Sequence, residues 1–393
     1  MSFIDDMEDI RMSDSPTKHS DVIVIGAGAV GSAAMYYLAR NGFDVIGLDR
    51  FPAAHDKGSS HGQTRIIRLA YFEHPNYVPL LKRSYELWEE LEEVSGSDLY
   101  TESGLIQVGP PDGEIVAGVR ESAAMHNLTV EEVTQADVRR SYPGFSIPDG
   151  MEAVFEKRAG FLKVEKCIQT FLDLAQNSGA RLHTGIEVLG WEPDSSDRIS
   201  VITNNGVFTA DRVIVTAGPW AGDLLDGLGV NLTVVRKSLF WFRSDNIYEL
   251  DSGCPAFFYE TPEGSFYGFP SIDELGLKVA EHTGGEPVID PLEVDRSKRR
   301  DDEAKIEYFL QEYLTTMNSP TLTDHKVCMY TRSPDEDFII DKVEEHPQVS
   351  YVAGLSGHGF KMASVLGEIM ADMATKGSTE HPIEFLSANR FNL

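Results

Sequence analysis

Short apolar runs alternate with longer amphipathic segments along this chain of 393 residues. Residues 22–25 and 45–48 are runs of β-branched and aliphatic side chains, which are typical of buried parallel strands. Residues 32–40 between them have helical character, and Gly42 suits the end of that helix. The pattern therefore predicts a strand, a helix and a second strand near the start of the chain.

Helices and strands alternate through the rest of the chain as well. A strong helix is predicted at residues 74–95, where Val78, Tyr85 and Trp88 share an apolar face and glutamates fill much of the other. Further helices are predicted at residues 114–127, 166–178, 301–315 and 363–374. Strands are predicted at residues 181–183, 187–189, 199–202, 207–209, 212–218, 237–242, 256–269 and 350–354, with a hairpin turn at 204–206. This order indicates an α/β fold whose first sheet is assembled from separated segments.

The turn after the first strand carries the first chemical motif. Gly26, Gly28 and Gly31 form G-x-G-x-x-G, and Asp49 closes the second strand. The first glycine allows a tight turn, the second lets backbone approach a pyrophosphate, and the third lets the helix pack close to the strand. A carboxylate at Asp49 suits a ribose hydroxyl. We interpret the unit as a dinucleotide-binding βαβ motif in preference to a plain glycine-rich turn, but the motif does not choose between NAD and FAD.

Composition narrows the possible functions. The chain has 34 Lys and Arg against 63 Asp and Glu, a net charge of −29, which disfavours binding to nucleic acid. The acidity fits either a salty habitat or simply a soluble surface. Cys167, Cys254 and Cys328 suggest neither a zinc site nor a disulfide framework, so we expect no metal.

Targeting and membrane segments are not expected. Residues 1–20 are acidic and polar, so we interpret them as a disordered tail instead of a signal peptide. No apolar run approaches ~20 residues, so no membrane span is predicted. We expect a cytoplasmic protein.

Seven sequence blocks carry a resemblance to a known family. The chain resembles the monomeric sarcosine oxidase and N-methyltryptophan oxidase family of flavoproteins from residue 21 to residue 391. The matching blocks are residues 58–68, 216–220, 267–270, 276–282, 327–330, 333–341 and 357–361. The resemblance implies FAD as the cofactor, and an α/β (α+β) fold with a Rossmann-like FAD-binding domain of the glutathione-reductase type. It also implies a second, substrate-binding domain built on a mixed β-sheet.

The implied domains are discontinuous. The FAD-binding domain is expected to comprise residues 21–95, 160–235 and 325–393, and the substrate-binding domain residues 96–159 and 236–324. We expect a monomer that acts on a small-molecule N-methyl amino acid and O2.

The resemblance also assigns cofactor residues. Cys328 matches the position where the family attaches the flavin 8α-methyl group through a thioether, although a lone cysteine after a valine is more often simple packing. His61 and Arg65 match residues beside the flavin, and we expect their charges to lower the pKa of the thiol. The full set of expected cofactor-binding residues is Gly26, Gly28, Gly31, Asp49, Arg50, His61, Thr64, Arg65, Gly218, Trp220, Cys328, Gly357, His358, Gly359, Phe360 and Lys361.

Substrate residues follow from the same resemblance. Arg68 and Lys361 match the pair that binds the substrate carboxylate, where the alternative is an ordinary salt-bridge partner. Lys278 matches the lysine that activates dioxygen, and His282 a residue that helps hold substrate. The expected catalytic group is Lys278, His282, Arg65 and Tyr267; the expected substrate-binding group is Arg68, Lys361, Tyr330 and Phe258. The region around Lys278 and His282 reads as strand and turn, not helix.

The implied reaction is oxidative N-demethylation of an N-methyl amino acid, of the sarcosine or N-methyltryptophan type, with O2. It yields formaldehyde, the primary amino acid and H2O2. An oxidase of another secondary amino acid (fructosyl amino acid, pipecolate or proline), a dehydrogenase using an electron carrier, and a non-catalytic FAD-binding protein remain alternatives. Ser60 and Gln63 replace residues common in relatives, and residues 272–275 differ from both branches of the family.

Overall fold

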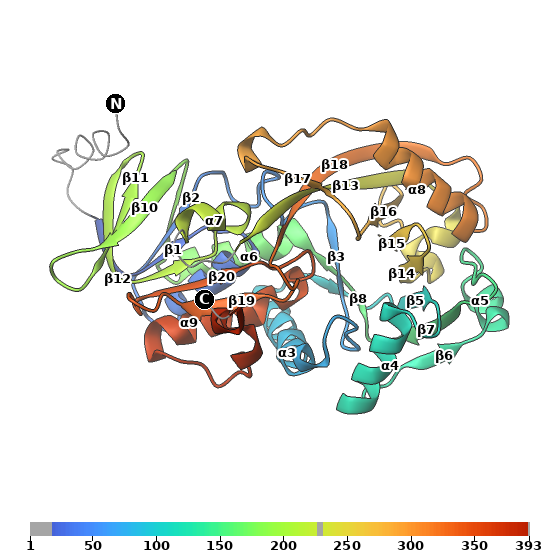
Figure 1. Cartoon of the computed structure of the whole chain (residues 1–393), viewed down its shortest axis with the longest axis horizontal. Coiled ribbons are helices and arrows are strands. Elements are labelled where there is room, and N and C mark those ends of the chain that lie inside the picture. Colours follow the sequence, from blue (N-terminus) through green and yellow to red (C-terminus); the bar gives the residue numbers. More distant parts are fainter. Residues whose placement is uncertain (1–17, 226–230, 392–393) are drawn as a thin grey trace.

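The computed structural model describes residues 18–225 and 231–391, and two large sheets dominate it (Figure 1). The first sheet has eight strands, and its central strands run parallel. Its path is β10 (Val188–Pro193), β11 (Ile199–Thr203), β12 (Gly206–Val215), β1 (Lys18–Ile25), β2 (Val45–Asp49) and β9 (Arg181–Thr184), with β20 (Val349–Ala353) on β12 and β19 (Ile339–Lys342) on β20.

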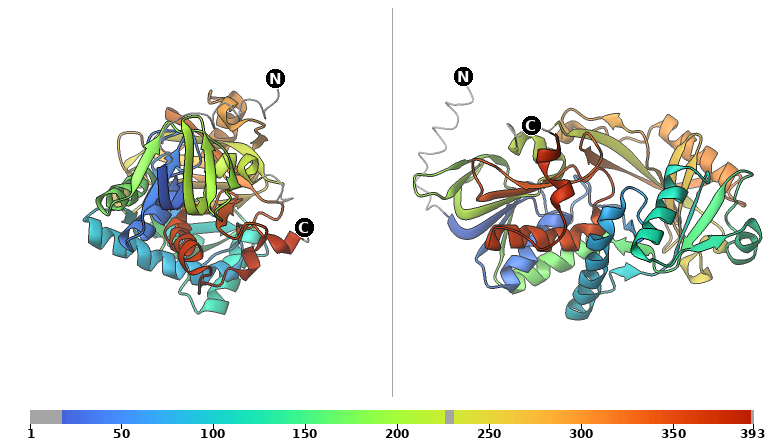
Figure 2. Two further views of the ribbon diagram at one scale, coloured as in Figure 1. Left: turned by 90° about the vertical axis from the view of Figure 1, so that its left-hand side faces the viewer. Right: turned by 60° about the horizontal axis from the view of Figure 1, so that its bottom comes forward.

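Helices cover one face of this first sheet. They are α2 (Ala29–Arg40), α6 (Val164–Asn177) and α9 (Ala363–Lys376), with α3 (Val78–Ser95) packed against α9. The right-hand view of Figure 2 shows the blue, green and red helices gathered below the strands. Because parallel strands are buried on both faces, their apolar runs are continuous, as in the fully buried stretch 22–25 of β1.

The second sheet has nine strands and is mixed. Its path is β17 (Glu286–Pro287), β13 (Thr233–Arg243), β16 (Leu277–Glu281), β15 (Gly264–Phe269), β14 (Ala256–Thr261), β5 (Leu105–Gly109), β7 (Glu152–Glu156) and β6 (Glu131–Val133), with β18 (Thr321–Arg332) on β13. α8 (Arg300–Tyr313) contributes Phe309 and Leu310 to the core on one face. α4 (Glu114–His126) contributes Val116 and Val119 to the core on the other, and α5 (Gln135–Ser141) follows β6.

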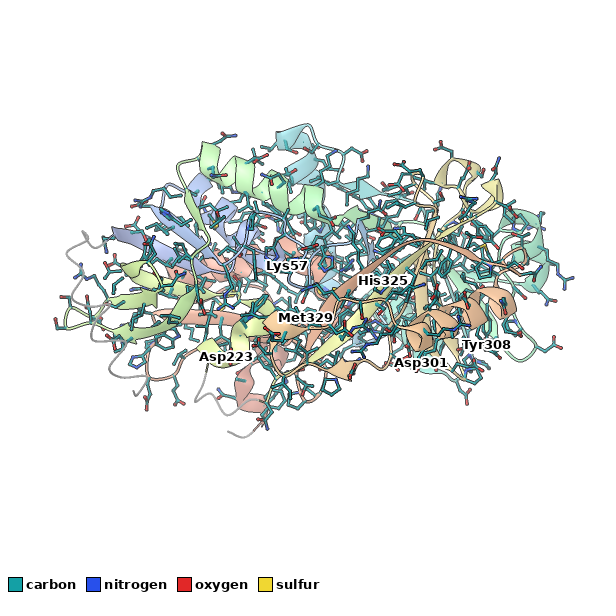
Figure 3. The ribbon with its side chains drawn as sticks, turned by 90° about the horizontal axis from the view of Figure 1, so that it is seen from above. Lys57, Asp223, Asp301, Tyr308, His325 and Met329 are labelled. Carbon is teal, nitrogen blue, oxygen red and sulfur yellow. The ribbon has the colours of Figure 1, made fainter. Side chains whose placement is uncertain are left out.

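A short third sheet connects the two halves. It consists of β3 (Thr64–Ile67), β8 (Gly160–Lys163) and β4 (Tyr100–Thr101). In the view of Figure 3, Met329 of β18 lies near the middle of the molecule, whereas Tyr308 of α8 lies toward one end. β3 and the end of β18 therefore meet where the two large sheets approach each other.

Most sequence-predicted elements are confirmed, with a few corrections. The hairpin at 204–206 joins β11 to β12. The two strands predicted at 207–209 and 212–218 are wrong as separate elements, because β12 is continuous and pairs first with β11 and then with β20. The helix predicted from residue 74 begins at Val78, after a 3₁₀ turn at Pro75–Tyr77. Residues 256–269 form two strands, β14 and β15, instead of one.

The boundary of the predicted tail also needs correction. The tail predicted at residues 1–20 lies outside the described residues up to position 17, but Lys18 and Ser20 already pair with β12. The expected domain boundaries at 235/236 and 324/325 fall inside β13 and β18, which pair with each other, and they stay predictions. The division into two domains likewise stays a prediction. None of the helices in residues 18–225 and 231–391 combines the length and apolar character needed to cross a bilayer.

Candidate active site

The glycine turn after β1 forms one end of a long cleft. At Gly26 the backbone φ is +89°, and a Cβ there would lie 2.6 Å from the Thr216 carbonyl oxygen. At Gly31 a Cβ would lie only 1.8 Å from the Gly26 carbonyl oxygen, whereas a Cβ at Gly28 would meet nothing within 4 Å. The three glycines therefore serve the turn, the helix packing and an open approach to the cleft, as the motif predicted.

Asp49 lies at the same end and organises the turn. Its Oδ2 accepts the Ala27 N–H at 2.8 Å, and its Oδ1 accepts the Phe51 N–H at 2.8 Å. Burial raises the pKa of Asp49, and these two hydrogen bonds oppose the shift. Arg50 ion-pairs with Glu187 at 2.6 Å and lies over the Trp220 ring at 5.8 Å.

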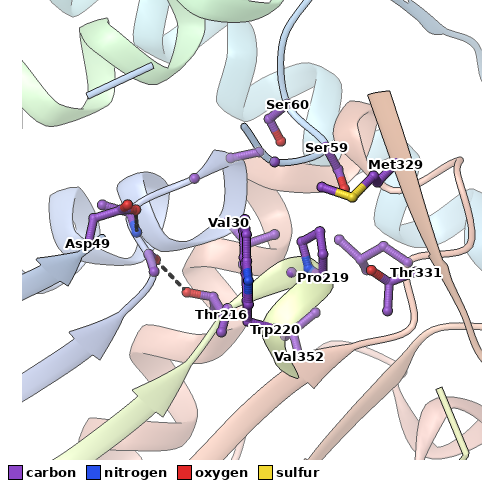
Figure 4. Close-up of a pocket in the computed structure, with 18 of the residues that line it drawn as sticks. Val30, Asp49, Ser59, Ser60, Thr216, Pro219, Trp220, Met329, Thr331 and Val352 are labelled. Carbon is purple, nitrogen blue, oxygen red and sulfur yellow. Dashed lines mark hydrogen bonds between the residues drawn. The ribbon is translucent and has the colours of Figure 1, made fainter. Parts of the chain in front are cut away.

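The long cleft has a volume of about 190 Å³ and runs from the glycine turn toward β18 (Figure 4). Figure 4 shows Asp49 at one end, Val30 near the middle, and Met329 and Thr331 at the other end. The predicted residues that line it are Gly26, Gly28, Asp49, Arg50, Arg65, Gly218, Trp220, Gly357, Gly359 and Phe360. Gly31, His61, Thr64 and Cys328 do not line it, and His358 and Lys361 line a neighbouring cavity instead.

That neighbouring small cavity, about 40 Å³, shares part of its wall with the long cleft. The shared residues are Arg65, Tyr330, Gly357 and Phe360. The remaining lining residues are Ile66, Arg68, Glu73, Phe258, Tyr267, His282, His358 and Lys361. All the predicted substrate-binding residues, together with His282 and Tyr267, therefore meet in one place.

Arg68 is buried in the small cavity with a partner that sequence reasoning missed. Its Nη2 contacts both carboxylate oxygens of Glu73, at 2.7 and 2.6 Å, and its guanidinium lies 4.0 Å from the Phe72 ring centre. Burial alone would raise the pKa of Glu73, but Arg68 and the nearby cations hold it at about 2. No motif marks Glu73, and its spacing from Arg68 matches neither strand nor helix periodicity.

A family model described as FAD dependent oxidoreductase matches residues 21–373. The chain is 41% identical over 380 residues to monomeric sarcosine oxidase of Bacillus sp. (strain B-0618), covering 95% of this chain and 96% of the relative. It is 38% identical over 373 residues to N-methyl-L-tryptophan oxidase of Citrobacter koseri, covering 94% and 99%.

The chain belongs to the FAD-dependent oxidoreductase family.

Solved structures of other members share the fold of this FAD-dependent oxidoreductase. NikD, an amino acid oxidase essential for nikkomycin biosynthesis, matches with a TM-score of 0.82 at 23% identity, covering 94% of this chain and 98% of NikD. L-proline dehydrogenase from P. horikoshii matches with a TM-score of 0.82 at 21% identity, covering 96% and 98%. At these identities the likeness concerns the fold alone.

The residues of this FAD-dependent oxidoreductase fit the cofactor. Trp220 lines the long cleft, and its buried Nε1 group has no hydrogen-bond partner among the described residues. Both ring nitrogens of the buried His61 also lack a partner there, but His61 lines neither the cleft nor the small cavity. Buried polar atoms left unpaired are costly, so the Trp220 Nε1 group suits a polar ligand.

His61 is buried beside Arg65. Burial, reinforced by Arg65, lowers the pKa of His61 to about 3, which favours the neutral imidazole near pH 7. The neutral ring offers one donor and one acceptor. This shift disfavours the positive charge expected on His61, and the role of His61 beside the flavin stays a prediction.

Cys328 lies just behind the wall of the long cleft. Its thiol is free and buried, and Sγ lies 3.3 Å from the Ser59 carbonyl oxygen. The Arg65 Nη2 group lies 3.4 Å from the same sulfur. Ser59 and Arg65 both line the cleft, so the sulfur is one contact away from it, with a guanidinium beside it.

Lys278 lies in β16 and is held by the segment before β3. Its Nζ donates to the carbonyls of Gly62 at 2.5 Å and Thr64 at 2.8 Å, and contacts the Thr64 hydroxyl at 3.2 Å. Burial, helped by Arg65, lowers the pKa of Lys278 well below its usual value. The three oxygen atoms favour the ammonium form and oppose that shift.

Lys361 is the second cation of the small cavity. Its Nζ donates to the His358 carbonyl at 2.8 Å and to the Tyr71 hydroxyl at 3.4 Å. Burial lowers the pKa of Lys361 to about 7, and Glu73 opposes the shift. The Lys361 charge therefore depends on small changes around it.

Aromatic rings and a neutral histidine complete the small cavity. The His282 ring centre lies 5.4 Å from that of Phe258 and 5.8 Å from that of Tyr330. The Tyr267 and Tyr330 hydroxyls are 3.4 Å apart. Burial, followed by the charge of Lys237, lowers the pKa of His282 to about 3. As predicted, Lys278 and His282 lie on a strand and the turn after it.

Proposed function

We propose that this chain oxidises N-methyl amino acids, consuming one O2 and one water to release formaldehyde, the primary amino acid and H2O2. The observation that carries the proposal is the small cavity, where two buried cations face aromatic walls beside the long cleft. The relatives named sarcosine oxidase and N-methyl-L-tryptophan oxidase support the same assignment.

The two cations of the cavity would bind the substrate carboxylate. Arg68 presents the planar fork that matches a carboxylate, and Lys361 offers a second donor on the same cavity wall. Glu73 already occupies Arg68, so a substrate anion must share or displace that pair. The Lys361 ammonium, bound only to a carbonyl and a hydroxyl, is the freer of the two cations.

The remaining groups would hold the amine in its neutral form. His282 is neutral near pH 7, and Tyr267 and Tyr330 carry un-ionised hydroxyls, because burial raises their pKa values above the usual range. Glu73, the carboxylate that lines this cavity, is already paired with Arg68, so the aromatic walls offer no free anion to an ammonium and leave the nitrogen lone pair available. FAD, when bound, supplies the two-electron oxidation and the return of electrons to O2.

We further propose that FAD is attached covalently through Cys328. The Cys328 sulfur lies one contact behind the cleft wall, with the Arg65 guanidinium 3.4 Å away and the Ser59 carbonyl 3.3 Å away, so it is placed to reach a flavin bound in the cleft. Acid precipitation of the flavoprotein should leave the yellow colour in the pellet, and Cys328→Ala should release it to the supernatant. Cys254→Ala is the matched control, because Cys254 is equally buried but lies in the second sheet's core. A colourless wild-type pellet contradicts the linkage.

Lys278 is the proposed group for the reaction with O2. It is buried, shares the neighbourhood of Arg65, and has its ammonium fixed by three oxygen atoms. A fixed cation stabilises negative charge that develops on O2 as electrons arrive.

A substrate panel tests the proposal as a whole. Peroxide release is measured with sarcosine, N-methylalanine, N-methyltryptophan, L-proline, L-pipecolate and a fructosyl amino acid. We expect the N-methyl amino acids to be oxidised and their methyl esters to be poor substrates, since esters lack the anion that Arg68 and Lys361 bind. Turnover of esters at the rate of the free acids would remove the carboxylate assignment. Substrate-driven bleaching of the flavin without peroxide would indicate a dehydrogenase.

A further inference from the structure

Lys237 is a buried lysine that neither the motif nor the cavity lining picked out. It lies in β13, only 4% exposed, opposite Cys328 of β18. Its Nζ donates to three successive backbone carbonyls, those of His282 at 3.1 Å, Thr283 at 2.6 Å and Gly284 at 3.5 Å. Burying an ammonium costs free energy unless other polar groups replace its water, and among the described residues the only groups that do so here are the backbone carbonyls of residues 282–284.

The carbonyls belong to an irregularity in the second sheet. β13 pairs with β16 as far as Leu239 and Ala280, and pairing resumes with β17 at Arg236 and Glu286. Residues 237–238 of β13 therefore face residues 281–285 of the partner. The extra residues leave the ladder, as in a wide β-bulge, and their carbonyls lack strand partners. The Lys237 ammonium takes the place of the missing ladder hydrogen bonds at His282 and Thr283, whereas the Gly284 carbonyl also accepts a hydrogen bond from Arg332 Nη2 at 2.8 Å.

His282 is the first residue of this bulge and lines the small cavity. On its other side, its N–H donates to the Ser265 carbonyl at 2.7 Å, so the backbone of His282 is fixed from both neighbouring strands. Lys237 also lies 5.3 Å from the centre of the Tyr330 ring, a second wall of the cavity. Lys237 therefore contacts His282 and Tyr330 from outside the small cavity and does not line the cavity itself.

We propose that Lys237 is a positioning residue for substrate oxidation, which orders the bulge at residues 282–284 and thereby aims His282 and Tyr330 into the small cavity. The inference rests on the proposed function of that cavity. The charge of Lys237 also helps to keep His282 neutral, because it is the largest cause, after burial, of the lowered pKa of His282. Burial also lowers the pKa of Lys237 itself, to about 8, and Glu281 opposes the shift. Lys237 is therefore still mostly protonated near pH 7.

The test separates the two half-reactions in the flavin-loaded enzyme. Lys237→Met keeps the length of the side chain but removes all three donors. We expect anaerobic flavin reduction by sarcosine or the best substrate of the panel to slow about ten- to hundredfold, because small misplacements of positioning groups have effects of this size. Reoxidation by O2 should change less than twofold. Equal slowing of both half-reactions, or no slowing of reduction, overturns the proposal.

Two further variants make the outcome specific. Lys305→Met is the matched control: Lys305 lies 3.2 Å from Glu281 near the same bulge but is more than half exposed and binds none of the carbonyls, so it should change reduction less than twofold. Lys237→Gln keeps two of the three N–H donors, on a shorter and uncharged side chain. It should show a smaller loss with the same selectivity for reduction, and it decides the matter if Lys237→Met does not fold.

A double-substitution series distinguishes this inference from the proposed function. If Lys237 acts through His282, adding Lys237→Met to the His282→Asn variant should slow flavin reduction further by less than about threefold. That residual slowing would reflect the contact of Lys237 with Tyr330. Full multiplication of the two losses overturns the proposal. If His282→Asn alone leaves reduction unchanged, the role assigned to His282 fails instead. The dissociation constant of methylthioacetate, measured from the flavin absorption spectrum, provides a readout independent of turnover and should rise in Lys237→Met.

Discussion

The long cleft and the small cavity share a wall but are lined by different types of residue. The cleft is lined mostly by glycines and by apolar or neutral polar side chains, and its charged residues already have protein partners: Asp49 and Arg65 bind backbone groups, and Arg50 pairs with Glu187. The cavity buries Arg68, Glu73 and Lys361 within a much smaller volume. One space therefore selects by shape and hydrogen bonding, and the other by charge.

This difference predicts where each space is vulnerable. At the glycine turn that forms one end of the cleft, a carbon atom added at Gly26 or Gly31 collides with backbone, so steric substitutions there should be the most damaging. In the cavity, the buried charges balance one another, so substitutions that change charge should dominate. The predictions below test that contrast, beginning with the largest expected effect.

Gly31→Ala should abolish the flavoprotein. A Cβ at this position lies 1.8 Å from the Gly26 carbonyl oxygen and 2.6 Å from the Thr216 hydroxyl oxygen, so α2 cannot keep its place on β1. The yield of soluble yellow protein and its flavin-to-protein absorbance ratio measure the effect. Gly28→Ala is the matched control, because a Cβ there meets no protein atom within 4 Å. It should fold normally and lose only part of its flavin; normal flavin loading of Gly31→Ala would contradict the contrast.

Lys278→Met should slow reoxidation of the reduced flavin about a hundredfold. A fixed cation worth ~3 kcal/mol to developing negative charge corresponds to roughly that factor. Stopped-flow mixing of the reduced enzyme with O2 measures the rate, and anaerobic reduction by substrate should change far less. Lys326→Met on β18 serves as the control lysine. Parallel loss in both half-reactions would show that Lys278 holds the segment around Gly62 and Thr64 instead of acting on O2.

Arg68→Ala should weaken binding of methylthioacetate by about ten- to a hundredfold. Loss of a charge-assisted hydrogen bond costs on the order of 1.5–3 kcal/mol. Spectral titration of the flavin gives the dissociation constant. Glu73→Gln sharpens the test, because it removes the anion that occupies Arg68 and should tighten binding several-fold. Weaker binding in Glu73→Gln would mean that Glu73 orients Arg68 for the substrate instead of competing with it.

The affinity for methylthioacetate should fall as the pH rises through neutrality. The protonated form of Lys361 binds the anion, and burial lowers its pKa to about 7. Affinity is therefore highest below pH 7 and decreases above it, by up to about tenfold between pH 6 and pH 8. The ligand has no group that titrates in this range. A Lys361→Met variant should bind more weakly and show a flat profile; a sloping profile in that variant would assign the titration to another group.

The cleft was easier to predict than the cavity for a physical reason. Gly26, Gly28, Gly31 and Asp49 lie within one βαβ unit, and each acts through local backbone geometry that a short sequence pattern records. The cavity brings together β3, β14, β15, β18 and the segment after β20, so its composition depends on tertiary packing. Only the family resemblance placed its residues, and the roles assigned to them stay predictions.

Neither the sequence motifs nor the family resemblance identified Glu73 or Lys237. Glu73 is recognisable only through its contact with Arg68, because a glutamate in a loop has no distinguishing pattern. Lys237 is recognisable only through the register change between β16 and β17. A lysine in an apolar strand reads as an exposed edge residue, and the strand instead lies inside a sheet with β18 and β16 on either side. The neutral state of His61 likewise follows from burial, which sequence does not give.

The interleaved order of the first sheet has a consequence for how the protein is made. β1 lies beside β12, β12 beside β20, and the residues that close the cleft, Gly357 and Phe360, precede α9. Contacts so distant along the chain form late in folding. At roughly 5–20 residues per second, translation of the chain takes about 20–80 s, and the cleft stays incomplete for nearly all of that time. The glycine turn is therefore synthesised long before the cleft is complete, and only a nearly finished polypeptide can bind FAD.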